Sequence, residues 1–436
     1  MARLNECILY RNFEHGEILD KMAELMNAWE QKAPDLKEKE GLFFECANRL
    51  VETAGSYGFS GNLWHCYLTF LLVNNENAFS TACEIRGAVN GSINELALND
   101  FGVFKELYDF DLTVLDEAFG ISCCKVLGDY TNTGSNSKMF NSRIRDRICD
   151  LSKTLAAAES TEEFMKDMVQ FYKDFGVGKL GLHKAFRVGH DENDNVEIQP
   201  ITRIAHVKLE DLVGYEIPKQ KLIENTEAFV RGRKANNCLL FGDAGTGKSS
   251  SIKGILNRYY DEGLRIIEVY KHQFQDLNDV IAQIKNRNYK FIIYMDDLSF
   301  EEFEIEYKYL KAVIEGGLEK KPDNILIYAT SNRRHLVREK SGDKLEVADD
   351  EDLHSSDTVQ EKLSLVYRFG VRIYFGAPNK KEFQNIVTTL AERYGVTMPA
   401  EELLTKANAW ELSHGGLTGR TAQQFIDHVL GTSEEQ

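Results

Sequence analysis

The sequence of 436 residues lacks cysteines at metal-binding or redox spacing, a long apolar run and an excess of positive charge. Its eight cysteines form no Cys-x-x-Cys pair and no Cys/His cluster with zinc spacing, so we expect reduced, mostly buried thiols. The formal charge of −17 argues against a broad electrostatic surface for DNA, RNA or anionic lipid. We therefore expect no nucleic-acid partner, with a local basic patch as the open alternative.

The longest apolar run, residues 63–73, is about half of the ~20 residues that a membrane-spanning helix needs. This run contains His65 and predicts a buried helix. The first ten residues have neither the basic start nor the apolar core of a signal peptide. These absences predict a cytoplasmic protein without membrane contact. The hydrophobic content of 43% is enough for real cores, and the length suggests about two to four domains.

The two halves of the chain differ in the spacing of their apolar residues. From residue 14 to about residue 172 this spacing is helical, which predicts a mainly α-helical N-terminal domain. A polar turn at 190–195 and alternating apolar residues at 196–204 indicate extended connecting structure. We therefore place a domain boundary near residue 200.

Beyond residue 200, apolar segments alternate with helical stretches. The expected strands are residues 237–241, 265–270, 291–295, 325–330 and 371–375. Strands joined by helical crossovers predict a parallel sheet that is covered on both faces. After Pro378 the chain is helical again, as in a small lid beside a nucleotide, so the expected domains are 1–200, 201–378 and 379–436. The acidic segment 339–357 predicts a solvated, mobile insertion.

The most informative segment is CLLFGDAGTGKSS at residues 238–250, which contains GxxxxGK[ST] in full. Polyphosphate must be wrapped by closely approaching backbone N–H groups, and glycine takes the required dihedral angles without a clash. Lys248 is expected to reach the β- and γ-phosphates of ATP, and the Ser249 hydroxyl is expected to ligate Mg²⁺. The expected nucleotide-binding residues of this loop are Gly242, Asp243, Ala244, Gly245, Thr246, Gly247, Lys248, Ser249 and Ser250.

Two further strands end in polar side chains. The segment FIIYMDD delivers Asp296 and Asp297 to the edge where parallel sheets bind ligands. Asp296 fits the role of anchoring Mg²⁺, and Asp297 fits a group that orients or deprotonates the attacking water, although a plain turn is the alternative. Asn332, after the strand ILIYATS, is a candidate for holding this water or sensing the γ-phosphate, or else it caps the next turn.

Together these motifs resemble the AAA+ ATPases. The resemblance gives Arg368, in LSLVYRFG, the position of the arginine finger that acts on a neighbouring subunit's nucleotide, with Arg372 as a rival. It gives Arg420, in GGLTGRTAQQF, the sensor-2 position, with a surface helix residue as the alternative. The segment LEDLVGYEIPKQKL resembles the lining of the adenine pocket, or is a plain helix start, and its candidate base contacts are Val213, Gly214 and Tyr215.

The resemblance extends to a bacterial family of AAA+ proteins that has only a label of unknown function. It includes GYEIPKQKLIENTEAF, GDAGTGKSS, DDLSFE, ATSNRRHL and GRTAQQF, and the N-terminal phrase GNLWHCYLTFLLVNNENAFSTACE looks like that family too. It implies an α/β P-loop NTPase (AAA+) with a parallel sheet and a helical C-terminal lid, preceded by a mainly α-helical domain. It also implies ATP and Mg²⁺ as ligands, and it supplies no substrate.

Two departures from the AAA+ pattern matter. The usual Asp-Glu pair is Asp296-Asp297 here, so the expected base is one methylene shorter, and Glu301 or Glu302 is a possible substitute. Beyond residue 270 there is no clear aromatic-Val-Gly pore loop, which argues against threading of polypeptide.

Three functions remain open at this point. The first is a homo-oligomeric ATPase, completed by Arg368 in trans, that remodels or loads a protein client bound through the N-terminal domain. The second is a nucleotide-gated binding switch with little turnover, which the Asp297 departure favours. The third is a helicase-loader-like ATPase at DNA, which the acidic balance opposes.

Overall fold

The computed structural model describes residues 4–88, 90–132, 142–202, 204–300, 306–315, 322–332 and 365–432. The expected acidic insertion at 339–357 and the two substitute bases, Glu301 and Glu302, lie outside these residues. The chain divides into two compact units, Met1–His183 and Lys184–Gln436. This division falls before the expected boundary near residue 200, because residues 185–200 form strands that belong to the sheet of the second unit.

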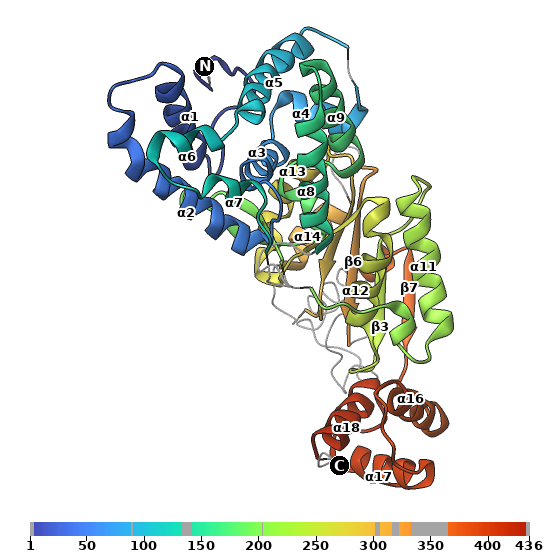
Figure 1. Ribbon diagram of the computed structural model, residues 1–436. Coiled ribbons are helices and arrows are strands. Elements are labelled where there is room, and N and C mark those ends of the chain that lie inside the picture. Colours follow the sequence, from blue (N-terminus) through green and yellow to red (C-terminus); the bar gives the residue numbers. More distant parts are fainter. Residues whose placement is uncertain are drawn as a thin grey trace. The chain divides into compact units, whose positions relative to one another are not determined.

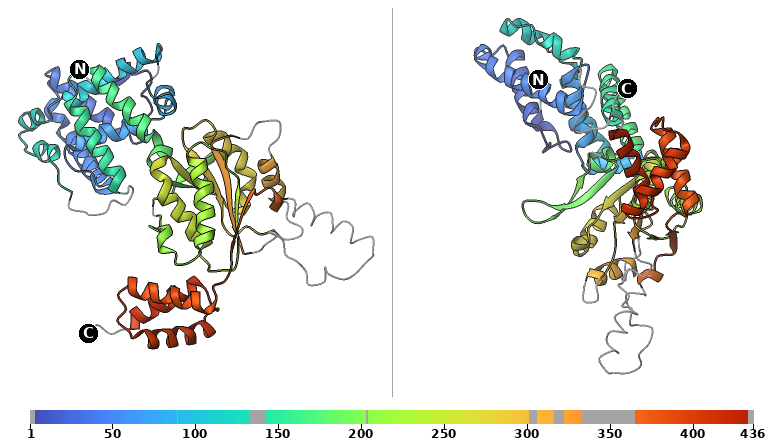
Figure 2. Two further views of the ribbon diagram at one scale, coloured as in Figure 1. Left: turned by 90° about the vertical axis from the view of Figure 1, so that its right-hand side faces the viewer. Right: turned by 90° about the horizontal axis from the view of Figure 1, so that it is seen from below.

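The first unit is built from helices, as predicted (Figure 2). They are α1 (Glu17–Glu30), α2 (Glu40–Tyr57), α3 (Leu63–Asn74), α4 (Ala78–Arg86), α5 (Ile93–Asp109), α6 (Thr113–Phe119), α7 (Cys124–Gly128), α8 (Ser142–Ala157), α9 (Thr161–Phe175) and α10 (Gly178–Leu182).

Helix α3 corresponds to the apolar run in the sequence, and residues 66–73 of it are all buried. It begins where the Asn62 side chain accepts a hydrogen bond from the backbone N–H of His65 at 3.1 Å, which satisfies one free donor of the first turn. A helix that is apolar on all sides suits the interior of a domain. Among the described residues, no helix has both the length and the apolar character that a membrane span needs.

The second unit contains a seven-stranded sheet in the order β2-β1-β4-β5-β6-β3-β7. The expected strands are present as β3 (Cys238–Gly242), β4 (Leu264–Glu268), β5 (Lys290–Met295), β6 (Ile325–Ser331) and β7 (Val371–Phe375), and all their pairings are parallel. The sequence missed β1 (Ala185–His190) and reduced β2 (Val196–Pro200) to connecting structure. These two strands form an antiparallel hairpin, and β1 extends the sheet beside β4 (Figure 2, in green).

Helices cover the sheet (Figure 1). On one face, α11 (Glu216–Val230) and α12 (Lys248–Tyr259) share a buried apolar cluster with side chains from the strands β3 to β7. Helices α13 (Leu277–Ile284) and α14 (Glu306–Glu315) pack against each other, and α13 contacts β2. The strand order makes β3 a neighbour of β6 and β6 a neighbour of β5. The chain segments that follow these strands therefore leave the same edge of the sheet side by side.

The C-terminal helices α16 (Lys380–Arg393), α17 (Ala400–Ser413) and α18 (Gly419–Thr432) pack around an apolar core of their own (Figure 2, in red). The entry into α16 is fixed by a capping box, in which Asn379 accepts from the backbone N–H of Glu382 while the Glu382 carboxylate accepts from that of Asn379. These helices make up the segment for which the sequence predicts a lid, and they are helical as expected.

Candidate functional site: a nucleotide pocket

The loop between β3 and α12 has the backbone that its glycines predict. Gly242, Gly245 and Gly247 have φ angles of 132°, 74° and 90°, which disfavour any residue with a side chain. A Cβ atom on Gly242 would lie 2.1 Å from the carbonyl oxygen of Phe375, and one on Gly247 would lie 2.4 Å from a methyl carbon of Leu212. The loop is therefore closely packed and leaves space only for backbone at these positions.

The Lys248 side chain is held inside this loop and is buried. Its ammonium group donates hydrogen bonds to the carbonyl oxygens of Gly242 at 3.0 Å and Asp243 at 2.6 Å, and to Oδ1 of Asn332 at 2.9 Å. Burial lowers the pKa of Lys248, and the nearby carboxylates oppose this effect. Because an ammonium group has three N–H donors, all of them are engaged here.

Asp296 gathers three hydroxyl groups. Its Oδ1 accepts hydrogen bonds from Ser249 at 2.8 Å, Tyr294 at 2.6 Å and Thr330 at 2.5 Å. Packing around the carboxylate raises its pKa, but these hydrogen bonds outweigh that effect and hold the pKa below its ordinary value. Asp296 is thus kept ionised beside the Ser249 hydroxyl, as the expected metal-binding pair requires.

Asp297 and Asn332 are also brought together, as expected for a site at the sheet edge. The Asn332 Nδ2 donates to Oδ1 of Asp297 at 2.8 Å, while its Oδ1 accepts from Lys248. Asp297 has a φ of 49°, and its backbone N–H donates to the Thr330 hydroxyl at 2.9 Å. A single amide therefore links the lysine of the loop to the second carboxylate.

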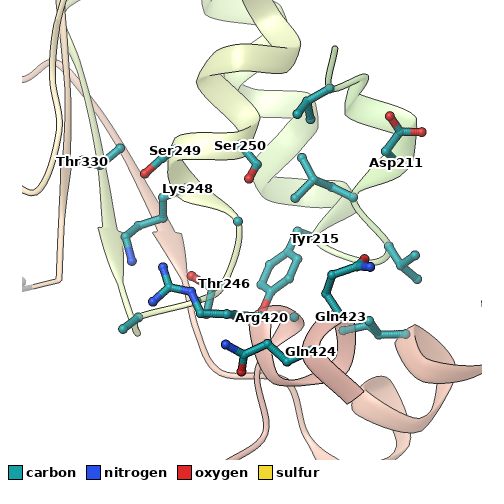
Figure 3. A pocket seen from close by; sticks show the side chains of 18 of the residues that line it. Asp211, Tyr215, Thr246, Lys248, Ser249, Ser250, Thr330, Arg420, Gln423 and Gln424 are labelled. Atoms are coloured by element: carbon teal, nitrogen blue, oxygen red, sulfur yellow. The ribbon is translucent and has the colours of Figure 1, made fainter. Parts of the chain in front are cut away.

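These groups line a pocket with a volume of about 630 Å³, within the usual range for small-molecule sites (Figure 3). Its predicted lining residues are Val213, Tyr215, Ala244, Gly245, Thr246, Gly247, Lys248, Ser249, Ser250, Asp296, Asp297, Asn332 and Arg420. The sequence reasoning missed Val207, Asp211, Leu212, Thr330, Ile386, Leu390, Gly419, Gln423 and Gln424. Many of the missed residues lie within or beside the two segments LEDLVGYEIPKQKL and GGLTGRTAQQF, from which the sequence reasoning singled out only Val213, Gly214, Tyr215 and Arg420.

The segment before α11 supplies one wall of the pocket. Tyr215 stacks on Phe375 with a centroid separation of 5.4 Å, and its hydroxyl donates to the carbonyl oxygen of Gly376 at 3.1 Å. Burial raises the pKa of Tyr215 to about 12, so the phenol stays neutral. Gly214 is not among the lining residues, but its φ of 80° permits the turn that places Val213 and Tyr215 in the lining.

The three candidate arginines are placed differently. Arg420 stands at the start of α18 and lines the pocket, and its backbone N–H donates to the carbonyl oxygen of Gly245 at 3.2 Å. Arg368 forms an ion pair with Glu315 at the end of α14 and is not among the described lining residues. Arg372 lies over the Tyr367 ring at 5.4 Å from its centroid. Only Arg420 is thus brought to the pocket.

The residues present fit a nucleoside triphosphate with Mg²⁺. The loop has space only for backbone at two of its glycines, where a Cβ atom would collide with a neighbour. Backbone N–H groups and the Lys248 ammonium are the donors that suit polyphosphate. The hydroxyl of Ser249 and the carboxylate of Asp296 are the oxygen ligands that Mg²⁺ prefers.

The parallel sheet, the phosphate loop after β3 and the polar side chains after β5 and β6 define an α/β P-loop NTPase of the AAA+ class, of unknown specific function. Residues 182–433, more than half of the chain, match the family described as "Protein of unknown function (DUF815)", and the chain belongs to that family.

Among solved structures, the chain is similar to RuvB of Thermotoga maritima. One RuvB variant shares 18% identity at a TM-score of 0.36, over 51% of this chain and 64% of that one. RuvB described as a Holliday junction branch migration motor shares 15% identity at a TM-score of 0.32, over 51% of this chain and 71% of that one. The chain thus spans just under two thirds of the first of these structures. No curated protein matches its sequence.

Proposed function

We propose that this protein binds ATP with Mg²⁺ and hydrolyses it to ADP and phosphate, in order to remodel or load a protein client. The observation that carries the proposal is the convergence of Lys248, the Ser249–Asp296 pair and the Asp297–Asn332 pair at one pocket. A phosphate-binding lysine, a pair of metal ligands and a base held by an amide are the parts that phosphoryl transfer to water needs.

Binding of the polyphosphate depends on the loop amides and on Lys248. Since all three N–H donors of its ammonium group are engaged, Lys248 must give up at least one hydrogen bond to contact a phosphate. Ser249 and Asp296 would hold Mg²⁺. When bound, this ion would neutralise part of the negative charge of the phosphates. Arg420 lines the pocket and adds positive charge from the lid.

Asp297 is the proposed group that orients the attacking water and accepts its proton. The Nδ2 of Asn332 donates to Oδ1 of Asp297 and so holds the carboxylate in place. Lys248 donates to Oδ1 of Asn332 and so fixes the orientation of the amide. A carboxylate that is already held by a hydrogen bond loses less conformational freedom when it aligns a water molecule. This lowers the activation barrier for hydrolysis. The water itself must reach the carboxylate from the exposed side of Asp297.

Arg368 is proposed to act on the nucleotide of a neighbouring copy. Its guanidinium is only partly buried beside Glu315, at the surface of the second unit. A surface arginine that is held by a single carboxylate can leave it when copies of the chain assemble. Its guanidinium can then contact a phosphate of the neighbouring copy's nucleotide. The helical first unit is the part of the chain that the pocket does not use, and we assign client binding to it.

A nucleotide-gated switch with little turnover is the second candidate. The observation that favours it is the Asp297–Asn332 hydrogen bond, which occupies one oxygen of a carboxylate that is already one methylene shorter than glutamate.

The test is phosphate release from ATP, measured per subunit against protein concentration. The ATPase proposal expects a rate that rises with concentration, is lost in Arg368→Ala and is kept in the matched control Arg372→Ala. Equal rates in Arg368→Ala and the wild type at every concentration would refute the in-trans role. Tight ATP binding without phosphate release at any concentration would instead favour the switch.

A further inference from the structure

Two cysteines that are far apart in the sequence meet in the first unit. Cys66 on α3 and Cys149 on α8 place their sulfur atoms 4.0 Å apart, across 83 residues of chain. The two helices pack against each other. A disulfide needs a sulfur separation of about 2.05 Å, so the two sulfur atoms must approach each other by about 2 Å to be joined.

The surroundings of the pair separate the roles of the two thiols. Cys66 is fully buried, and its sulfur lies 3.6 Å from the carbonyl oxygen of Ser60 and 3.5 Å from the Ser152 hydroxyl. Cys149 is partly exposed. A pocket of about 380 Å³ is lined by Ser60 and Ser152, the same residues that contact the Cys66 thiol. A small solute therefore has space beside two residues that contact the Cys66 thiol, although neither cysteine lines the pocket itself.

The thiol of Cys149 is the more acidic partner. The hydrogen bond from Cys66 lowers the pKa of Cys149, with further help from the Ser60 backbone and Arg145, while burial and Asp146 act in the opposite direction. The same hydrogen bond and burial raise the pKa of Cys66, so that it keeps its proton.

Other cysteines of the first unit lack this environment. Burial raises the pKa of both Cys46 and Cys83 to about 11, and it also raises that of Cys123, which is partly exposed like Cys149. Of these four thiols, Cys149 is therefore the one whose surroundings favour the thiolate.

We propose that Cys149 and Cys66 are a peroxide-reactive dithiol, in which Cys149 is attacked by oxidant and Cys66 resolves the product into a disulfide. The Cys149 thiolate attacks one oxygen of a hydroperoxide, the O–O bond breaks, and Cys149 sulfenic acid forms, while the departing hydroxide or alkoxide takes a proton from solvent to leave as water or an alcohol. The Cys66 sulfur then attacks the Cys149 sulfur. The S–S bond forms, the S–O bond breaks, and the departing hydroxide takes the Cys66 proton to leave as water. Two thiols supply the two electrons that reduce one peroxide.

The test treats the full chain at pH 7 with one equivalent of hydrogen peroxide, blocks free thiols, and identifies cross-linked peptides by mass spectrometry. We expect a Cys66–Cys149 disulfide in the wild type and in the control Cys83→Ser. In Cys66→Ser, we expect Cys149 sulfenic acid that a dimedone probe captures. Oxidation of other cysteines while Cys66 and Cys149 stay reduced would overturn the proposal.

A second measurement on the unmodified wild type keeps the test independent of whether a variant folds. The rate of Cys149 alkylation by iodoacetamide is followed from pH 6 to 9, with Cys123 in the same sample as the internal comparison. Because the pKa of Cys149 is lowered and that of Cys123 is raised, we expect Cys149 to react at least about tenfold faster than Cys123 at pH 7, with its midpoint at a lower pH. Equal rates for the two cysteines would overturn the assignment of Cys149 as the reactive thiol.

Discussion

Replacing Asn332 by aspartate tests whether its amide governs both nucleotide binding and turnover. In the wild type, Oδ1 of Asn332 lies 2.9 Å from the Lys248 ammonium and Nδ2 lies 2.8 Å from the Asp297 carboxylate. The substitution Asn332→Asp keeps the size of the side chain and adds one negative charge between these two groups. We expect weaker ATP binding and slower turnover, together with a free energy of unfolding that is lower by about 1 kcal/mol, because the hydrogen bond to Asp297 is lost.

The magnitudes follow from the two distances. Even in the dielectric of water, which gives the smallest values for a buried lysine, unit charges at these separations interact by about 1.4 and about 1.5 kcal/mol, so attraction to Lys248 and repulsion from Asp297 are of nearly equal size. If the hydrogen bond that Lys248 gives up to contact a phosphate is the one to residue 332, this attraction is lost. A cost of about 1.4 kcal/mol corresponds to an ATP affinity that is roughly tenfold weaker.

The assay combines urea denaturation of the ligand-free protein with titration of a non-hydrolysable ATP analogue. The control Asn332→Ala removes both hydrogen bonds without adding charge, so it should bind the analogue at least as tightly as the wild type while it loses turnover. If Asn332→Asp binds the analogue with the wild-type affinity, or if Asn332→Ala loses as much affinity as Asn332→Asp, the reasoning about Lys248 fails.

Three further substitutions test separate parts of the site. Asp297→Asn should bind ATP normally yet release no phosphate, because an amide does not accept the proton of water; normal turnover would contradict the assignment. Tyr294→Phe removes one donor to Asp296 and should lower the free energy of unfolding by about 1 kcal/mol in urea denaturation. Since the pKa of Asp296 is lowered on folding, this contribution is present above about pH 4 and is lost only as the pH falls through the lowered value, so the deficit should be constant from pH 6 to 8. Gly247→Ala should weaken nucleotide binding, whereas the control Gly263→Ala, at a similar φ but with open space around its added carbon, should lower stability alone.

The phosphate loop and the acidic strand could be predicted because their chemistry is local. A glycine-rich turn between a strand and a helix is read from consecutive residues, and Lys248 and Ser249 follow from it. The meeting of Asp296 with Ser249 required one further step, namely that parallel strands deliver their following residues to the same edge.

The Thr330 hydroxyl beside Asp296 was missed because strand register is not visible in a single sequence. Met295 of β5 pairs with Ala329 of β6, and this register places the next residues, Asp296 and Thr330, within hydrogen-bond distance. A shift of one residue would send the Thr330 side chain to the other face of the sheet. The hairpin of β1 and β2 was missed for a related reason, since its pairing with β4 joins segments that are distant in the sequence.

The amide of Asn332 offers a physical link between nucleotide occupancy and the readiness of the base. While Lys248 donates to Oδ1 of Asn332, the amide is held in the orientation that directs Nδ2 to Asp297. If a phosphate draws Lys248 away, this constraint is released, and the amide is free to turn toward a water or the γ-phosphate. The ATPase and the nucleotide-gated switch then differ in what Asn332 does next. If its amide keeps its hydrogen bond to Asp297, the carboxylate stays oriented and ATP is hydrolysed. If the amide leaves Asp297, the protein responds to bound ATP without hydrolysing it. Phosphate release by the wild type, Asn332→Ala and Asp297→Asn separates these two cases. The ATPase predicts a wild-type rate well above zero that both variants lose. The switch predicts a wild-type rate near zero, which neither variant can lower.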